Sequence, residues 1–247
     1  MNKDRIKKAY FHLPGLFEFY ELYRVFLPLF SDHREYFYDW CEIGSVYGAP
    51  SGCIWGGGRV EEGYEDPGKV LELMEKYEIS ARLTFSNSLI RKEHLTDRRC
   101  NALCALFEDS LKKQSGVIVH SDLLLDHIKR NYPGLYFVSS TTKVLTDFSQ
   151  FMGEVNREEF LYAVPDFRLN KSFDKWKTLS QRKTRWNFYV MNAAGSDAGT
   201  EKAAMRLSAA KIWERTARST IARLLTPVMV IVFQRQWKIR DLSASKS

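Results

Sequence analysis

Several features that would identify a class of protein are absent from this sequence. Cysteine does not occur after Cys104, and no GxGxxG motif follows the first predicted strand. Spacing alone reveals no zinc-type pairs of Cys or His, no nucleophile–base pair, no metal triad and no paired acids. These absences argue against a typical dinucleotide-binding sheet and against a metal site in this chain, and they leave any cofactor unknown.

Long apolar segments are also absent. No uninterrupted apolar run exceeds six residues, the length reached at 102–107 and 228–233, whereas a membrane-spanning helix needs about 20. The first residues, MNKDRIKKAYFHLPG, are charged and lack the apolar stretch of a signal peptide. We therefore expect a cytoplasmic protein with reduced cysteines and no transmembrane segment. Cys100 and Cys104, four apart on a predicted helix, are interpreted as small buried hydrophobic side chains.

Charge is divided sharply between two parts of the chain. Residues 1–170 contain 21 Lys and Arg against 25 Asp and Glu, a net charge of −4. Residues 171–247 contain 16 against 5, a net charge of +11, so the overall +7 belongs wholly to the C-terminal third. Such a basic tail is typical of proteins that bind nucleic acid or an anionic membrane. A tail that does not belong to the fold would give the same pattern.

The N-terminal segment, 1–38, is crowded with aromatic side chains. Apolar residues recur at helical spacing over 16–29, which predicts an amphipathic helix with a wide apolar face. Such a face must be covered, and the flank or open end of a β-sheet is the best candidate.

Strands and helices alternate over residues 39–175. Strands are predicted at 40–48, 80–87, 116–121, 135–142 and 159–170, with a helix after each of the first four. One of these helices has Asp66 as its N-cap and Pro67 at its first position, and the next is expected to be capped by Thr96. The strands are mostly hydrophobic on both faces, which indicates parallel βα units. A doubly wound sheet and a (β/α) barrel both fit, and the missing GxGxxG favours the barrel.

Polar side chains follow these strands, at the end where ligands bind in either architecture. Asp122 and the residues 139–142 are equally well explained as helix caps, and His120 as a base, a ligand or a core residue. Glu42 lies in an apolar run and therefore needs a partner, for which Arg82 and Arg168 are candidates. The candidate catalytic residues are Glu42, Asn87, His120, Asp166 and Arg168.

A family resemblance rests on four runs: WCEIGSVYGAP, LTFSNSLI, IVHSDLLLDHIKRNYPGLYFVSSTTKVL and AVPDFRLNK. Over about residues 9–175 the chain resembles a group of bacterial (β/α)-barrel proteins. That group is distantly similar to the collagenase-like peptidase barrels and their iron–sulfur hydroxylase relatives. The resemblance implies a peptidase-like enzyme, or one that depends on an iron–sulfur cluster or a divalent metal. In such proteins the next strand carries an Asn-Glu-x-Cys element followed by further cysteines, which this chain lacks.

The codons implied by the tail explain that absence. If the last base of each codon is read with the first two of the next from Trp186, one permitted reading is EFLCNECCWFGCRDRKGCYE. Glu is forced at Trp186–Asn187 and at Met191–Asn192; most other positions are permitted by codon degeneracy rather than forced. A one-base insertion or deletion near 176–182 would therefore make everything downstream an out-of-frame translation.

The sequence thus predicts a partial (β/α) TIM-type barrel of about five units over 39–175. The aromatic helical segment 1–38 precedes it and the basic tail 176–247 follows it. The parent would be an enzyme acting on a small molecule or peptide, with its metal or cluster ligands in the missing part, and this chain would be truncated and inactive. We do not expect it to bind nucleic acid. The alternative is a non-enzymatic protein that binds nucleic acid or an anionic membrane through a basic amphipathic helix in the tail, at 203–225. The oligomeric state stays open.

Overall fold

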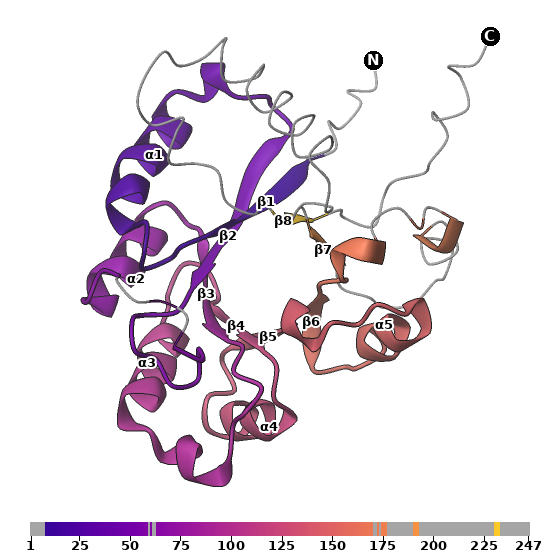
Figure 1. The fold of residues 1–247 in the computed structure, drawn as a ribbon. Coiled ribbons are helices and arrows are strands. Elements are labelled where there is room, and N and C mark those ends of the chain that lie inside the picture. The colour runs from indigo at the N-terminus through magenta and orange to yellow at the C-terminus, as the bar shows by residue number, and fades with distance from the viewer. Residues whose placement is uncertain are drawn as a thin grey trace, which may run out of the picture.

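The computed structural model describes residues 8–58, 60, 63–169, 172 and 174–176, together with the backbone of 190–192 and 230–232. Within these residues six parallel strands alternate with helices along the chain (Figure 1). The strands are β1 (Ala9–Pro14), β2 (Cys41–Gly48), β3 (Ser80–Phe85), β4 (Gly116–Val119), β5 (Tyr136–Ser139) and β6 (Phe160–Ala163). The helices are α1 (Tyr20–Asp32), α2 (Pro67–Lys76), α3 (Arg98–Glu108), α4 (Asp122–Asn131) and α5 (Phe148–Val155).

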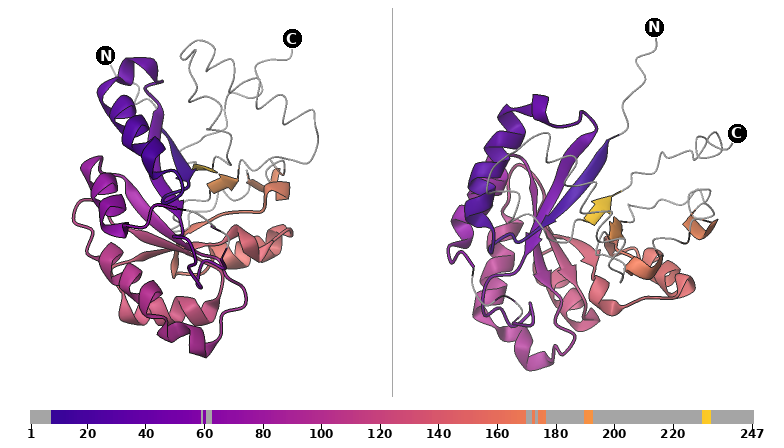
Figure 2. Two further views of the ribbon diagram at one scale, coloured as in Figure 1. Left: turned by 60° about the vertical axis from the view of Figure 1, so that its left-hand side comes forward. Right: turned by 45° about the horizontal axis from the view of Figure 1, so that its top comes forward.

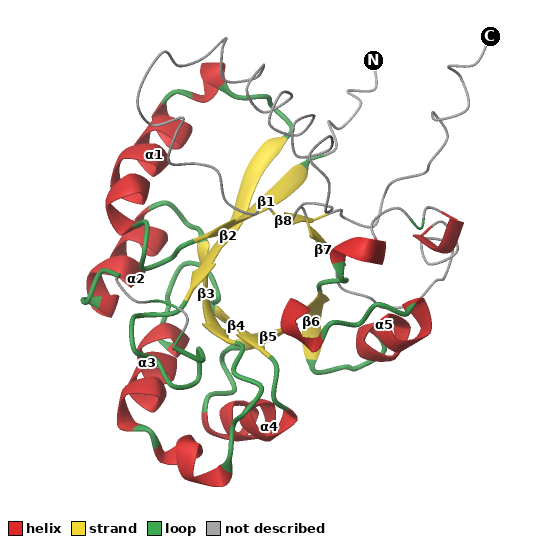
Figure 3. Cartoon of the chain, viewed as in Figure 1, coloured by secondary structure: helices red, strands yellow, loops and turns green. Residues whose placement is uncertain are grey.

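The six strands form one curled sheet, a half-barrel. Their order is β6-β5-β4-β3-β2-β1, and each neighbouring pair is parallel. Figure 3 shows the sheet curling in an arc with α1 to α4 on its outer side, and the two views of Figure 2 show the same arrangement. The predicted partial (β/α) barrel is therefore confirmed.

The N-terminal segment contributes a strand that the sequence did not predict. Residues 9–14 form β1, which pairs in parallel with β2, so this segment belongs to the sheet and supplies a sixth unit. The aromatic helix predicted over 16–29 is α1, shifted toward the C-terminus by a few residues. Tyr20, Tyr23 and Leu27 form its buried face. β1 was missed because its six residues, AYFHLP, lie in an aromatic-rich stretch that was assigned as a whole to a helical segment.

Two short strands lie beyond β1 in the sheet. β8 (Val230–Val232) pairs antiparallel with β1, and β7 (Val190–Asn192) pairs antiparallel with β8. The basic helix predicted at 203–225 falls outside the described residues. The described part of the tail thus adds antiparallel strands where a barrel would continue with parallel βα units.

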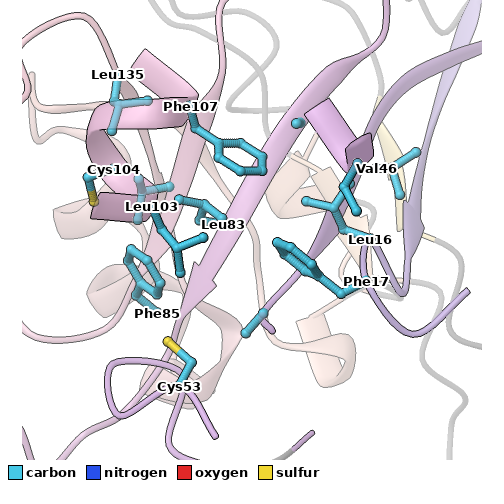
Figure 4. Close-up of a cluster of buried hydrophobic side chains, with 14 of the residues drawn as sticks. Leu16, Phe17, Val46, Cys53, Leu83, Phe85, Leu103, Cys104, Phe107 and Leu135 are labelled. Atoms are coloured by element: carbon cyan, nitrogen blue, oxygen red, sulfur yellow. The ribbon is translucent and has the colours of Figure 1, made fainter. Parts of the chain in front are cut away.

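The main hydrophobic core lies between the outer face of the sheet and the helices. Alternate residues of β3, namely Ala81, Leu83 and Phe85, point outward and are at most 1% exposed. They pack with helix residues such as Leu103 and Phe107 of α3, as Figure 4 shows. Burying a side chain of this size contributes roughly 1.5–3 kcal/mol, so this layer holds the helices on the sheet.

The helix starts agree with the sequence in one case and differ in two. The Asp66 side chain accepts hydrogen bonds from the backbone N–H groups of residues 68 and 69 at the start of α2, as predicted. Asp97, rather than Thr96, caps α3 and accepts from the N–H of residue 100. Ser121, rather than Asp122, caps α4, and Asp122 lies in the first turn. Adjacent capping residues compete for one position, and the path of the loop that leads into the helix decides between them.

Candidate functional site

The concave face of the sheet carries polar and aromatic side chains. In β3 the residues Ser80, Arg82 and Thr84 alternate with the outward-facing core residues and therefore point into the curl. Arg82 is only 2% exposed. A buried guanidinium is costly unless its charge and its N–H donors are satisfied, so neighbouring groups must stabilise this side chain.

Two tyrosines, one from β5 and one from β6, hold the Arg82 side chain. Its Nε donates a hydrogen bond to the Tyr136 hydroxyl at 2.6 Å, and the Ser80 hydroxyl lies 2.6 Å from the same oxygen. The guanidinium carbon lies 4.3 Å from the centre of the Tyr162 ring and 5.3 Å from that of Tyr136, within range of cation–π attraction. β5 and β6 thus both contribute to fixing one arginine of β3.

Gly116 of β4 makes this arrangement possible. It pairs with Arg82 on one side and Tyr136 on the other. A methyl group added at Gly116 would lie 2.5 Å from two atoms of the Tyr136 ring, well inside van der Waals contact. The absence of a side chain therefore lets the phenol lie across β4 and reach the guanidinium.

His12 of β1 completes the concave face. Its ring lies 5.8 Å from that of Tyr162 in an edge-on arrangement, although β1 and β6 are at opposite ends of the parallel strand order. The curl is therefore tight enough for these two strands to meet across the interior. The His12 Nδ1 atom is 2.6 Å from the Ser45 hydroxyl, while its Nε2 atom is buried without a partner among the described residues.

The electrostatics of this cluster keep the imidazole neutral. Burial, together with the nearby positive charge of Arg82, lowers the pKa of His12 to about 2. Burial likewise raises the pKa of the Tyr47 hydroxyl, on the neighbouring strand, to about 12. Among the described residues Arg82 makes no ion pair with a carboxylate. The described part of the interior therefore carries one positive charge that lacks a counter-charge.

A second group of polar side chains lies where β4 and β5 end. His120 Nδ1 is 2.7 Å from the Thr142 hydroxyl, which is 2.9 Å from the Ser140 hydroxyl. Ser140 caps the short 3-10 helix η3 (Thr141–Lys143) and accepts from the Thr142 N–H. An imidazole beside a hydroxyl at this distance has the geometry of a base–nucleophile pair, and it lies at the end of the sheet where barrel enzymes carry their active sites.

Three of the other predicted residues lie at this same carboxyl end. Asn87 follows β3, where its side chain accepts from the Leu89 N–H at 2.8 Å and donates to the Ile54 carbonyl at 2.8 Å. Asp166 follows β6, is 7% exposed, and accepts from both the backbone N–H and the guanidinium of Arg168 at 2.9 and 3.1 Å. Asn87 therefore stabilises its loop, and the Asp166–Arg168 pair does the same after β6.

Glu42 is at the opposite end of the sheet from its predicted position. It is the second residue of β2 and lies at the amino-terminal edge, because the strand extends six residues beyond it. It pairs with Lys8 at 2.6 Å and with Arg34 at 3.7 Å, not with Arg82 or Arg168. The predicted strand 40–48 already places Glu42 near its start, so the assignment of Glu42 to the carboxyl end was wrong.

The sequence reasoning missed Arg82, Tyr136, Tyr162 and His12 as a group. One available signal was the alternation of polar and apolar residues in β3, SARLTF, which places Ser80, Arg82 and Thr84 on one face. The contacts across the interior left no such signal, since they join strands that are distant in the sequence.

The described residues contain no group of three or more His, Cys, Asp or Glu side chains that could hold a metal ion. They contain no helix that is long and apolar enough to cross a membrane. Neither a family model, nor a curated protein, nor a solved structure matches this chain. The arguments about function that follow therefore rest on the residues themselves.

Proposed function

We propose that this chain is the first part of a (β/α)-barrel enzyme of the peptidase-like or metal-dependent kind, and that it is inactive by itself. The observation that carries the proposal is the direction of the strands beside β1. In a closed (β/α) barrel β1 is flanked by parallel strands on both sides, whereas here β8 is antiparallel to it. A tail that does not continue the βα repeat is what a shift of reading frame near 176–182 would produce.

The substrate of the parent enzyme would bind between the concave face and the carboxyl end of the strands. Arg82, with no carboxylate among its described neighbours, supports a substrate that carries a carboxylate or phosphate, for which a guanidinium is a preferred partner. His120 and Thr142, 2.7 Å apart, would move a proton during the reaction. Metal or iron–sulfur ligands would come from the missing part.

The nucleotide sequence of the gene tests the frameshift directly. We expect that adding or removing one base near codons 176–182 opens a frame that encodes Asn-Glu-Cys-Cys in place of residues 190–193. A gene whose codons there cannot encode cysteine in either shifted frame would contradict the proposal.

A frame-restored chain tests the enzyme part of the proposal. Purified beside the present chain, it should be more soluble, unfold cooperatively and contain iron or zinc by elemental analysis, whereas the present chain should lack the metal. Among the described residues β6 is the edge strand of the sheet, and an exposed edge of this kind promotes aggregation. If the present chain proves soluble, monomeric and cooperatively folded, that result would argue against truncation.

Substrate binding is tested with the Arg82→Gln variant of the frame-restored chain. It should raise KM for an anionic substrate at least about tenfold, since a charge-assisted hydrogen bond is lost, while leaving the metal content unchanged. An unchanged KM would remove Arg82 from the binding site.

A further inference from the structure

Two buried thiols meet outside the site described above. Cys53, in the loop that follows β2, and Cys100, the third residue of α3, have their Sγ atoms 3.5 Å apart. The two residues are 2% and 1% exposed. They are 47 positions apart in the sequence, so only the fold brings them together. Both precede residue 176, so the pair belongs to this chain whatever the frame of its tail.

The distance between the two sulfurs is short enough for a disulfide to form with little movement. A disulfide bond is about 2.05 Å long, so the two atoms need to approach each other by about 1.5 Å. Rotation of the side chains and a small shift of the loop can supply this approach. Among the described residues Cys53 and Cys100 are the only pair of thiols in hydrogen-bonding contact, and Cys41 and Cys104 are free as well. Oxidation is therefore expected to join this pair rather than another.

The surroundings make Cys53 the more reactive of the two thiols. A hydrogen bond from the Cys100 thiol lowers the pKa of Cys53 and outweighs the opposite effect of burial, and nearby backbone N–H groups and the charge of Arg99 add to it. The same hydrogen bond, together with burial, raises the pKa of Cys100. The thiolate is the form of cysteine that reacts with oxidants. Cys53 is thus oxidised first, and Cys100 is in position to react with the product.

The position of Cys53 in its loop gives a small oxidant a short route to the sulfur. Its neighbours Gly52 and Ile54 are both exposed, Ile54 by 38%. The backbone of 49–58 contains turns and no helix or strand. Such loops open locally far more often than the whole protein unfolds. Hydrogen peroxide is little larger than water, so a local opening admits it, and closure of the loop then brings the two sulfurs together again.

We propose that Cys53 and Cys100 form an oxidisable pair that closes to an intramolecular disulfide, with hydrogen peroxide as the oxidant. In the first step the Cys53 thiolate attacks one oxygen of the peroxide, the O–O bond breaks, and a sulfenic acid and hydroxide form. In the second step Cys100 gives up its proton, its sulfur attacks the sulfur of Cys53, and the S–O bond breaks with release of water. The two cysteines lose two electrons in total, and one peroxide is reduced to two molecules of water.

The disulfide would cross-link two segments at the carboxyl end of the sheet. It joins the loop after β2 to the first turn of α3, the helix that follows β3. The same loop is already hydrogen-bonded to Asn87, whose side chain donates to the Ile54 carbonyl at 2.8 Å. The link therefore fixes loops at the end of the barrel where the proposed active site lies. It should also raise the urea midpoint of the oxidised chain, because it restricts the unfolded ensemble.

The test oxidises the full chain with hydrogen peroxide at pH 7 and then unfolds it in urea with excess iodoacetamide. Intact mass spectrometry should show two alkylated cysteines instead of the four of the untreated chain, and dithiothreitol should restore all four. Trypsin should release peptide 35–59 linked to peptide 100–112, and fragmentation should place the bond between Cys53 and Cys100. The same oxidation carried out in urea, where the fold is absent, should lose this selectivity.

Variants identify the pair independently. Cys53→Ser and Cys100→Ser should each abolish the intramolecular link, whereas the matched controls Cys41→Ser and Cys104→Ser should keep it. Fragmentation is done on the unaltered chain, so its result stands even where a variant fails to fold.

Four outcomes would overturn the inference. The oxidised chain keeps four thiols that can be alkylated, the bond joins other cysteines, the link persists in Cys53→Ser, or peroxide yields only sulfinic acid or disulfide-linked dimers. None of these readouts measures activity or depends on the tail, so a failure of the proposed function would leave them unchanged.

Discussion

Replacing Gly116 by alanine tests how the concave face is held together. The new methyl group would lie 2.5 Å from two atoms of the Tyr136 ring and 2.8 Å from a third, so the ring must move by about 1 Å to regain ordinary contact. That movement pulls the hydroxyl away from both Arg82 and Ser80, which now lie 2.6 Å from it.

The magnitude follows from three contributions. Forced overpacking costs typically 1–3 kcal/mol, and a weakened hydrogen bond to a charged group costs about 1.5–3 kcal/mol if it is lost completely. Replacing a strand glycine by alanine recovers about 0.5–1 kcal/mol. We therefore expect Gly116→Ala to lower the free energy of unfolding by roughly 2–4 kcal/mol, measured by urea unfolding with circular dichroism.

A double-mutant cycle isolates the cause. In a Tyr136→Val background the space beside Gly116 is vacant, so the added methyl should cost about nothing or stabilise the protein slightly. Gly153→Ala is the control for glycine replacement itself. Among the described residues no atom beyond the neighbouring backbone of α5 lies within 4 Å of the methyl position at Gly153, so this change should stabilise the protein by about 1 kcal/mol. If Gly116→Ala costs as much in the Tyr136→Val background as it does with Tyr136 in place, the packing argument is refuted.

Three further results are expected. Burial lowers the pKa of His12 to about 2, below its value of about 6.5 in the unfolded chain. The contribution of His12 to the free energy of unfolding is therefore complete above pH 6.5 and falls by up to about 1.4 kcal/mol per pH unit below it. Urea midpoints that do not change between pH 7.5 and 5.5 would contradict this. Cys53, Cys100 and Cys104 are at most 2% exposed whereas Cys41 is half-buried, so limiting iodoacetamide should label Cys41 first in peptide mass spectrometry; earlier labelling of Cys53 would argue against it. Glu154→Gln removes the ion-pair partner of Lys143 at a site where each side chain is 12% exposed. It should lower the free energy of unfolding by roughly 2–3 kcal/mol, measured by thermal or urea unfolding. A loss below about 0.5 kcal/mol would show that water solvates the pair.

The helices and most of the strands could be predicted from local sequence patterns. Asp66 and Pro67 begin α2 as expected because a cap and a helix-compatible φ angle act within one turn. The apolar strands 40–48, 80–87 and 116–121 correspond to β2, β3 and β4. β1 was missed because six residues with several aromatics fit a helix or a strand equally well, and only pairing with β2 decides the matter.

The residues of the candidate site were predicted less completely than the fold. His120 lies at the end of β4 as predicted, since the end of an apolar strand can be read directly from the sequence. Glu42 was assigned to the wrong end of β2, and its partners Lys8 and Arg34 come from segments outside the predicted sheet. Ion pairs between distant segments depend on the register of strands, which no local pattern specifies.

The sequence by itself determined the alternation of strands and helices and the position of His120, because these depend on periodicity and on contacts within one turn or strand. Only the tertiary structure decided that Arg82, Tyr136, Tyr162 and His12 meet inside the curl. The physical reason is the curvature of the sheet, which brings β1 and β6 together although they are far apart in both sequence and strand order. The same curvature gives Gly116 its role, since a missing methyl group matters only when a ring from the next strand lies across it.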